Sequence, residues 1–122
     1  MSSHTVCHIE FSCTDLARSQ AFYGAIFDWK FASFGDSMVV FGSGDQHLGG
    51  LMKVDALQPG DSPSVWFEVA SVEETLGLAS GAGGEILSPR REIPGGIGFS
   101  GVFTDPAGNR VAVVEFAPKP SE

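Results

Sequence analysis

The sequence predicts an α+β fold in which two βαβββ modules form curved mixed sheets around a cleft. Short segments that alternate between apolar and polar residues, as half-buried strands do, are interrupted by two segments with helical spacing. The order of segments in residues 5–54 recurs in residues 64–116, at an offset of about 56 residues. Residues 55–63 link the two modules, and we expect a single domain, because 122 residues suffice for one hydrophobic core.

The first module begins with a strand and a helix. Residues 6–13 (VCHIEFSC) alternate, so that His8, Glu10 and Ser12 share one face of the predicted strand. Asp15 is a suitable N-cap for residues 16–27, whose apolar side chains follow helical spacing. Turn-forming residues then separate three further predicted strands, which cover residues 29–33, 37–42 and 47–54.

The second module repeats this order after the linker DALQPGDSP, which is rich in turn formers. Its first strand, residues 64–70, places Ser64, Trp66 and Glu68 on one face. Ser71 and Glu74 have the spacing of a capping box and predict a helix that ends near Ser80. Three strands complete the module, and a DPAGN turn precedes the last of them: residues 85–93, 97–104 and 110–116.

The charge balance excludes some classes of partner. The chain has 7 Lys and Arg against 15 Asp and Glu, a formal net charge of -8, which speaks against nucleic acid and against anionic membrane surfaces. The N-terminus lacks a basic segment followed by an apolar one, and no run of about 18 apolar residues occurs. We therefore expect an acidic cytoplasmic protein that binds neither nucleic acid nor membrane.

The two cysteines are predicted to be free thiols. Cys7 and Cys13 lie on the same predicted strand, where six residues span about 20 Å. A disulfide needs Cα atoms closer than about 7 Å.

Two long stretches resemble the vicinal oxygen chelate superfamily, which includes glyoxalase I, bleomycin resistance proteins and extradiol dioxygenases. HIEFSCTDLARSQAFYGAIFDWKF matches the family's opening pattern through His8, Asp15 and the pair Phe22 and Tyr23. GGEILSPRREIPGGIGFSGVFTDPAGNRVAVVE resembles the family's second module, which typically ends in DPxGN. The resemblance covers residues 6–116 and implies the paired-module, glyoxalase-like fold. It implies less about activity, because this fold serves several chemistries.

The resemblance also locates the positions at which metal-using relatives carry ligands, on the first and last strand of each module. His8 occupies the first position, but the last strand of the first module has no Asp or Glu. Ser64 and Ala112 occupy the two positions of the second module. Glu115 cannot replace Ala112, because residues three apart in a strand point to opposite faces. We therefore expect no metal cofactor, with His8 and His47 as weak candidate ligands if the sheet brings them together across the cleft.

The predicted cleft face instead carries aromatic and acidic side chains. Such a lining suits a planar or cationic organic molecule. Trp66 and Phe116 would stack on this molecule, and Glu10 or Glu68 would pair with its charge. Alternatively, the same side chains form a dimer interface or face solvent. The candidate ligand-binding residues are His8, Glu10, Ser64, Trp66, Glu68 and Phe116.

Three functions are compatible with these patterns. The leading hypothesis is a glyoxalase- and bleomycin-resistance-like protein with a metal-independent small-molecule cleft, which by analogy sequesters a toxic compound or an antibiotic. The alternative is a lyase, isomerase or dioxygenase with a divalent metal held at unusual positions, such as His8, His47 and Glu10. The third is an interaction module whose cleft is filled by its own side chains. In each case we expect a homodimer, which single-domain relatives often form.

Overall fold

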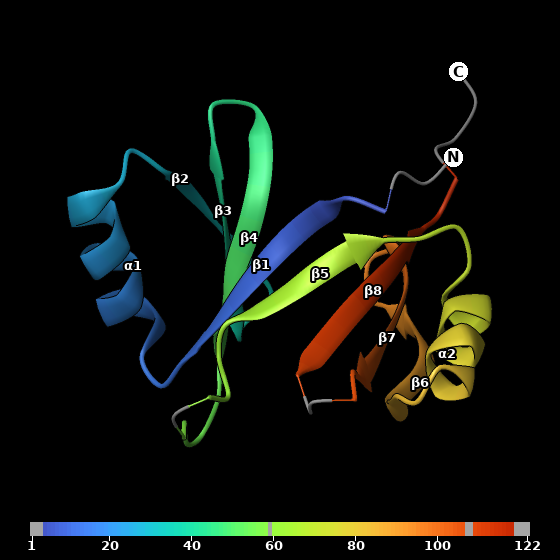
Figure 1. Ribbon diagram of the computed structural model, residues 1–122. Coiled ribbons are helices and arrows are strands. Elements are labelled where there is room, and N and C mark those ends of the chain that lie inside the picture. Colours follow the sequence, from blue (N-terminus) through green and yellow to red (C-terminus); the bar gives the residue numbers. More distant parts are fainter. Residues whose placement is uncertain (1–3, 59, 107–108, 119–122) are drawn as a thin grey trace. The chain divides into compact units, whose positions relative to one another are not determined.

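The computed structural model describes residues 4–58, 60–106 and 109–118, and its element order confirms the predicted α+β fold of two βαβββ repeats. Eight strands and two helices occur in these residues (Figure 1). Contacts divide the chain into two compact units. Cys7–Ser64 form the N-terminal unit, and Val65–Glu122 with Met1–Val6 form the C-terminal unit.

The N-terminal unit is a four-stranded mixed sheet covered by one helix. The strands run in the spatial order β2-β3-β4-β1, with β1 parallel to β4 and the other pairs antiparallel. Helix α1 packs against β3 and β4. The elements are β1 (Val6–Cys13), α1 (Leu16–Ile26), β2 (Lys30–Phe34), β3 (Met38–Ser43) and β4 (Gln46–Lys53).

The sequence signals for α1 are confirmed at its start. The Asp15 side chain accepts a hydrogen bond from the backbone N–H of Arg18 at 3.0 Å, as an N-cap does. The core beneath the helix is built on Phe41 and Leu51, with Phe11 and Tyr23 packed against them. No residue of α1 itself is buried, so this helix covers its sheet loosely.

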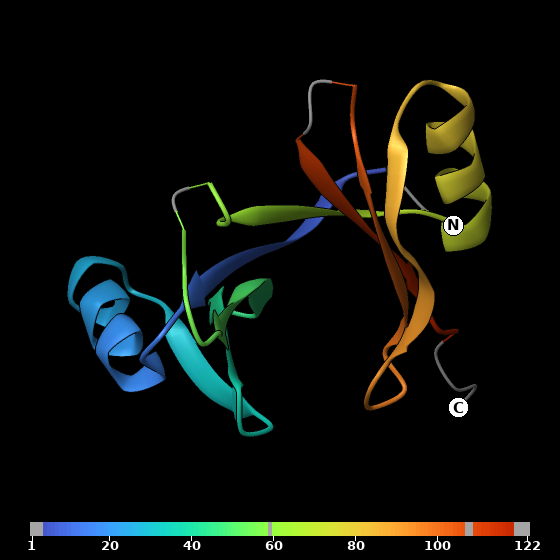
Figure 2. The same ribbon diagram turned by 90° about the horizontal axis from the view of Figure 1, so that it is seen from below.

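The C-terminal unit has the same plan. Its strands run in the order β5-β8-β7-β6, with β5 parallel to β8 and the remaining pairs antiparallel. Helix α2 lies against the face of β6, β7 and β8 (Figures 1 and 2). The elements are β5 (Ser64–Glu68), α2 (Val72–Gly81), β6 (Glu85–Ile93), β7 (Gly98–Thr104) and β8 (Arg110–Phe116).

Helix α2 packs more closely than α1. The Ser71 hydroxyl accepts from the backbone N–H of Glu74 at 3.1 Å, which confirms the predicted cap. Val72 and Leu76 are buried against the sheet. A Cβ at Gly101 of β7 would lie 2.7 Å from Val72, so the glycine is what permits this close approach.

Glu115 lies on the α2 side of β8, as its spacing from Ala112 predicts. One carboxylate oxygen accepts from the backbone N–H of Val72 at 3.0 Å, and the other accepts from Arg90 at 3.3 Å. The hydrogen bond from Val72 and the Arg90 guanidinium hold the pKa of Glu115 below its usual range. The Glu115 carboxylate therefore binds the N-terminus of α2.

Three further predictions concern the cysteines, the DPAGN turn and membrane-spanning helices. Cys7 and Cys13 are free thiols, and Cys13 is buried in the core. The predicted DPAGN turn falls partly outside the described residues, but its ends are joined, since the backbone N–H of Asn109 donates to Asp105 at 2.9 Å. Among the described residues, no helix has the length and apolar composition required to cross a membrane.

Candidate functional site

Three polar side chains of the N-terminal unit form a hydrogen-bonded chain on the sheet face opposite α1. His8 Nδ1 lies 2.8 Å from His47 Nε2, and His8 Nε2 lies 3.4 Å from a carboxylate oxygen of Glu10. The two imidazole rings are nearly parallel, with centroids 5.0 Å apart. Both His8 and Glu10 are mostly buried, with side chains 17% and 15% exposed, whereas His47 is exposed. The chain of contacts therefore ends at an accessible ring.

His47 reaches His8 by a route that differs from the prediction. The prediction required the sheet to curl and bring His47 across a cleft, but β1 and β4 are adjacent parallel strands of one unit. The pairing of β3 with β4 shifts at Phe41 and Gly42, so that Leu48 has no partner on β3. This bulge turns Leu48 to the core and leaves His47 on the face of His8.

The protonation of the histidine pair follows from its partners. A carboxylate only accepts hydrogen bonds, so we assign the proton of His8 to Nε2, which faces Glu10. His8 Nδ1 then accepts from the Nε2–H of His47. Partial burial lowers the pKa of His47, and the neighbouring His8 lowers it further, which favours the neutral form of the His47 ring. This assignment leaves Nδ1 of His47 as a hydrogen-bond acceptor.

The same three residues do not fit a catalytic metal centre. A catalytic zinc-type site needs three protein donors that converge on one point and an open position for substrate. Here the two ring nitrogens of His8 point to different partners, His47 and Glu10. Residues 4–58, 60–106 and 109–118 contain no group of three His, Cys, Asp or Glu side chains placed to hold an ion.

The remaining sequence-predicted residues lie around the parallel pair β5 and β8. Trp66 is the register partner of Ala112, and Glu68 is the partner of Val114. Trp66, Glu68 and Ser64 are partly buried, and Phe116 is 44% exposed. Ala112 is 3% exposed, so the position at which the sequence resemblance expects a ligand holds a buried methyl group.

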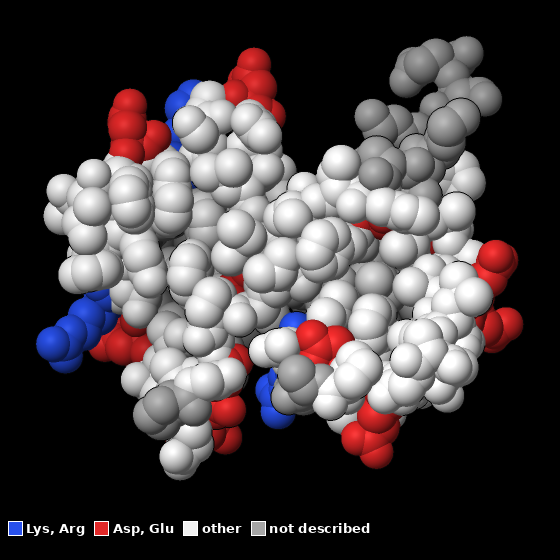
Figure 3. All heavy atoms as spheres, in the orientation of Figure 1, with Lys and Arg blue, Asp and Glu red and all other residues white. Residues whose placement is uncertain are grey.

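The acidic charge is dispersed on the face of the molecule that Figure 3 shows. On the face drawn in Figure 3, Asp and Glu side chains occur in several separate patches over both units, with few Lys and Arg among them. The net charge of -8 favours cationic ligands in general, and this face carries no single large acidic patch.

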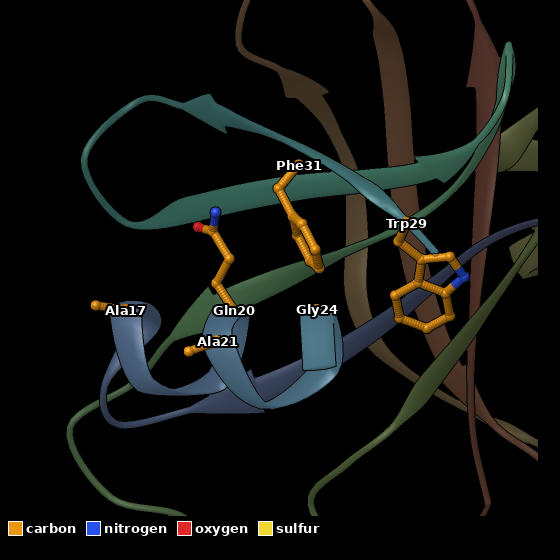
Figure 4. Close-up of a pocket in the computed structure, with 6 residues that line it drawn as sticks. All are labelled: Ala17, Gln20, Ala21, Gly24, Trp29 and Phe31. Carbon is orange, nitrogen blue, oxygen red and sulfur yellow. The ribbon is translucent and has the colours of Figure 1, made fainter. Parts of the chain in front are cut away.

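Sequence reasoning missed a hollow of about 420 Å³ between α1 and β2. It lies on the helix-covered side of the N-terminal sheet, where Trp29 and Phe31 line it (Figure 4). The sequence contains a signal for this hollow. The internal repeat aligns Gln20 of α1 with the buried Leu76 of α2, so a polar residue stands where the other module has a core residue.

Comparison with known proteins agrees with the fold. A family model for the glyoxalase/bleomycin resistance protein/dioxygenase superfamily matches residues 5–113. The chain therefore belongs to this superfamily, as its sequence resemblance implied. A search of curated proteins found no match.

Solved structures with the same fold have diverged far in sequence. A hypothetical protein from Bacillus halodurans C-125 is 13% identical with a TM-score of 0.74, over 97% of this chain and 98% of that one. Methylmalonyl-CoA epimerase from Mycobacterium tuberculosis is 12% identical with a TM-score of 0.73, over 93% and 88%. A Mn(II)-bound glyoxalase from Novosphingobium aromaticivorans is 15% identical with a TM-score of 0.68, over 99% of this chain but 42% of that one. At these identities the comparisons show the fold alone.

Proposed function

We propose that this protein binds a small organic molecule without using a catalytic metal, and that it sequesters a toxic compound or an antibiotic. The observation that carries the proposal is the identity of residue 112. A buried alanine there offers no donor atom, and Ser64 takes the other position of the second module. The donor set of a metal-using relative is therefore incomplete in this chain.

The polar face of the N-terminal unit indicates what kind of molecule would bind. Nδ1 of His47 and the carboxylate of Glu10 are both acceptors in the assigned hydrogen-bond pattern. Acceptors at both ends of the hydrogen-bonded chain suit a ligand with N–H donors and a positive charge, which the acidic chain as a whole also favours. We propose His8, Glu10 and His47 as residues that bind such a cation.

On β5 and β8 we separately propose Ser64, Trp66, Glu68 and Phe116 as ligand-binding residues. Aromatic rings can stack on a planar cation, and a carboxylate can pair with its charge. A homodimer is part of the proposal, and light scattering on the purified protein measures it directly.

The first test is metal content and binding of a planar cation. Protein purified without chelators should carry far less than one divalent metal per chain by mass spectrometry of the elements. Proflavine, a planar cation with N–H donors, should raise the melting temperature of this protein. Loss of one hydrogen bond of about 1 to 1.5 kcal/mol in His47→Ala should weaken proflavine binding roughly tenfold.

His4→Ala is the matched control, because His4 is an exposed histidine outside the hydrogen-bonded chain. It should leave proflavine binding unchanged. Stoichiometric divalent metal that disappears in His8→Ala would contradict the proposal. No response to proflavine or to a broad panel of organic cations would favour an interaction module instead.

One observation favours the metal-dependent alternative as a second candidate. The ring nitrogens of His8 and His47 already lie 2.8 Å apart, so two imidazoles are close enough to meet at one ion after a small movement. Turnover of a 2-oxoaldehyde hemithioacetal or a catechol that is abolished by EDTA and restored by metal would support a lyase, isomerase or dioxygenase. The proposal above predicts no such turnover.

A further inference from the structure

The hollow between α1 and β2 is a concave feature of the N-terminal unit, separate from the histidine chain. It has a volume of about 420 Å³, within the range of small-molecule sites. The side chains of Phe11 and Cys13 point to the α1 side of β1, whereas His8 and Glu10 point to the other side. The hollow and the histidine chain therefore lie on opposite faces of one sheet.

The lining of the hollow combines small residues with an aromatic wall. One face of α1 presents Ala17, Ala21 and Gly24, which leave space above the helix. Across that space stand the ring of Phe31 and the edge of Trp29 (Figure 4). A Cβ at Gly24 would lie 3.6 Å from the Phe31 ring, so any larger residue at position 24 would close this end.

The aromatic wall is held in place by stacking. Trp29 lies between Phe27 and Phe41, with centroid separations of 4.6 Å and 4.3 Å. Phe31 meets Trp29 edge-on at 6.5 Å. A wall fixed in this way costs little conformational entropy when a ligand binds.

The internal repeat shows that the hollow is a specific departure from the shared plan. Leu76 of α2 is 4% exposed and fills the space above the second sheet. The aligned residue of α1 is Gln20, whose amide projects into the hollow (Figure 4). The Gln20 amide has no hydrogen-bond partner among the described residues, so its donors and acceptor are available.

We infer that this hollow binds a flat aromatic ring system that carries an amide or similar hydrogen-bonding group at its edge. The ring would pack against Phe31 and the edge of Trp29, over the small residues of α1. The Gln20 amide would pair with the polar group and fix the orientation of the ring. This site is independent of the cation site proposed for the opposite face.

Protein-observed NMR with 2-naphthamide tests the inference. Saturable shifts are expected at the amides of Gln20, Ala21, Gly24 and Phe31 and at the indole N–H of Trp29. Gln20→Leu restores the residue of the repeat, and Ala21→Leu inserts a side chain into the hollow. Both should abolish the saturable shifts while keeping the helix, since leucine is a strong helix former.

Two controls separate this site from its surroundings and from the proposed function. Ala25→Leu makes the same change as Ala21→Leu on α1 outside the lining and should leave the shifts intact, as should His47→Ala. Decahydro-2-naphthamide, the saturated analogue, should bind much more weakly. Shifts that fail to saturate, that survive Ala21→Leu, or that cluster at His8 and His47 would overturn the inference.

Discussion

Replacing Gly49 by alanine is expected to destabilise the N-terminal unit by about 3 kcal/mol or more, which is at the upper end for overpacked sites. Gly49 sits on β4 beside Ile9 of β1, and a Cβ there would overlap the Ile9 carbonyl oxygen. The same Cβ would lie 2.9 Å from the ring of Phe41 in the core. The clash involves backbone, so a change of rotamer cannot relieve it.

Urea titration followed by tryptophan fluorescence measures this effect. The chain has two tryptophans, one in each unit, so a Trp66→Phe background leaves Trp29 as the reporter of the N-terminal unit. Gly77→Ala is the control, followed through Trp66 in a Trp29→Phe background, because Gly77 lies within α2 of the C-terminal unit and a Cβ there meets nothing within 4 Å. That change should stabilise the protein by about 0.5 to 1 kcal/mol. Equal effects of the two substitutions would contradict the steric argument.

The elements of this fold are readable from sequence because each depends on local chemistry. Asp15 and Ser71 cap their helices through their own side chains, and both caps occur where the spacing predicts them. Alternation of apolar residues fixes which face of β1 meets the core. The repeat then fixes the order of the elements, since each module must cover its own sheet with its own helix.

The contacts that the sequence did not reveal depend on pairing between strands. His47 joins His8 because Leu48 is bulged out of the β3–β4 ladder, and a strict alternation would place His47 on the other face. Position 42, beside the bulge, requires glycine, because a Cβ there would overlap the Gln46 carbonyl oxygen. A glycine in a strand signals such an irregularity without saying which side chain it redirects.

Strand β8 belongs to the fold of the family, but it has no carboxylate at residue 112. Ala112 and Glu115 lie on one strand and on opposite faces, and the resemblance expects a ligand only at the position of Ala112. The carboxylate of Glu115 is used to hold α2 on its sheet. Glu115, near the end of the last strand, therefore serves the fold of the C-terminal unit, whereas the polar chain of His8, Glu10 and His47 belongs to the other unit.

Loss of the Glu115 side chain is expected to destabilise the C-terminal unit by about 1.5 to 3 kcal/mol, the range for a hydrogen bond to a charged group. In Glu115→Ala the backbone N–H of Val72, a buried residue, loses its acceptor, and Arg90 loses its ion pair. Arg90 would keep its position over the Phe99 ring, 3.5 Å from the centroid, so its exposed pair with Glu115 contributes the smaller part. Urea titration in a Trp29→Phe background, with Trp66 as reporter, measures the change.

The contribution of Glu115 should also depend on pH. Its pKa is lower in the folded protein than in the unfolded chain, because the Val72 N–H and Arg90 favour the carboxylate. Stability from this group is therefore fully present above the ordinary carboxyl pKa of 4.5 and is lost as pH falls below it toward the folded value. Glu115→Gln keeps an acceptor for Val72 but removes the charge, so its stability deficit at pH 7 should shrink on acidification to about pH 3, below the ordinary pKa. A Glu115→Gln deficit that stays constant with pH would show that the charge contributes nothing.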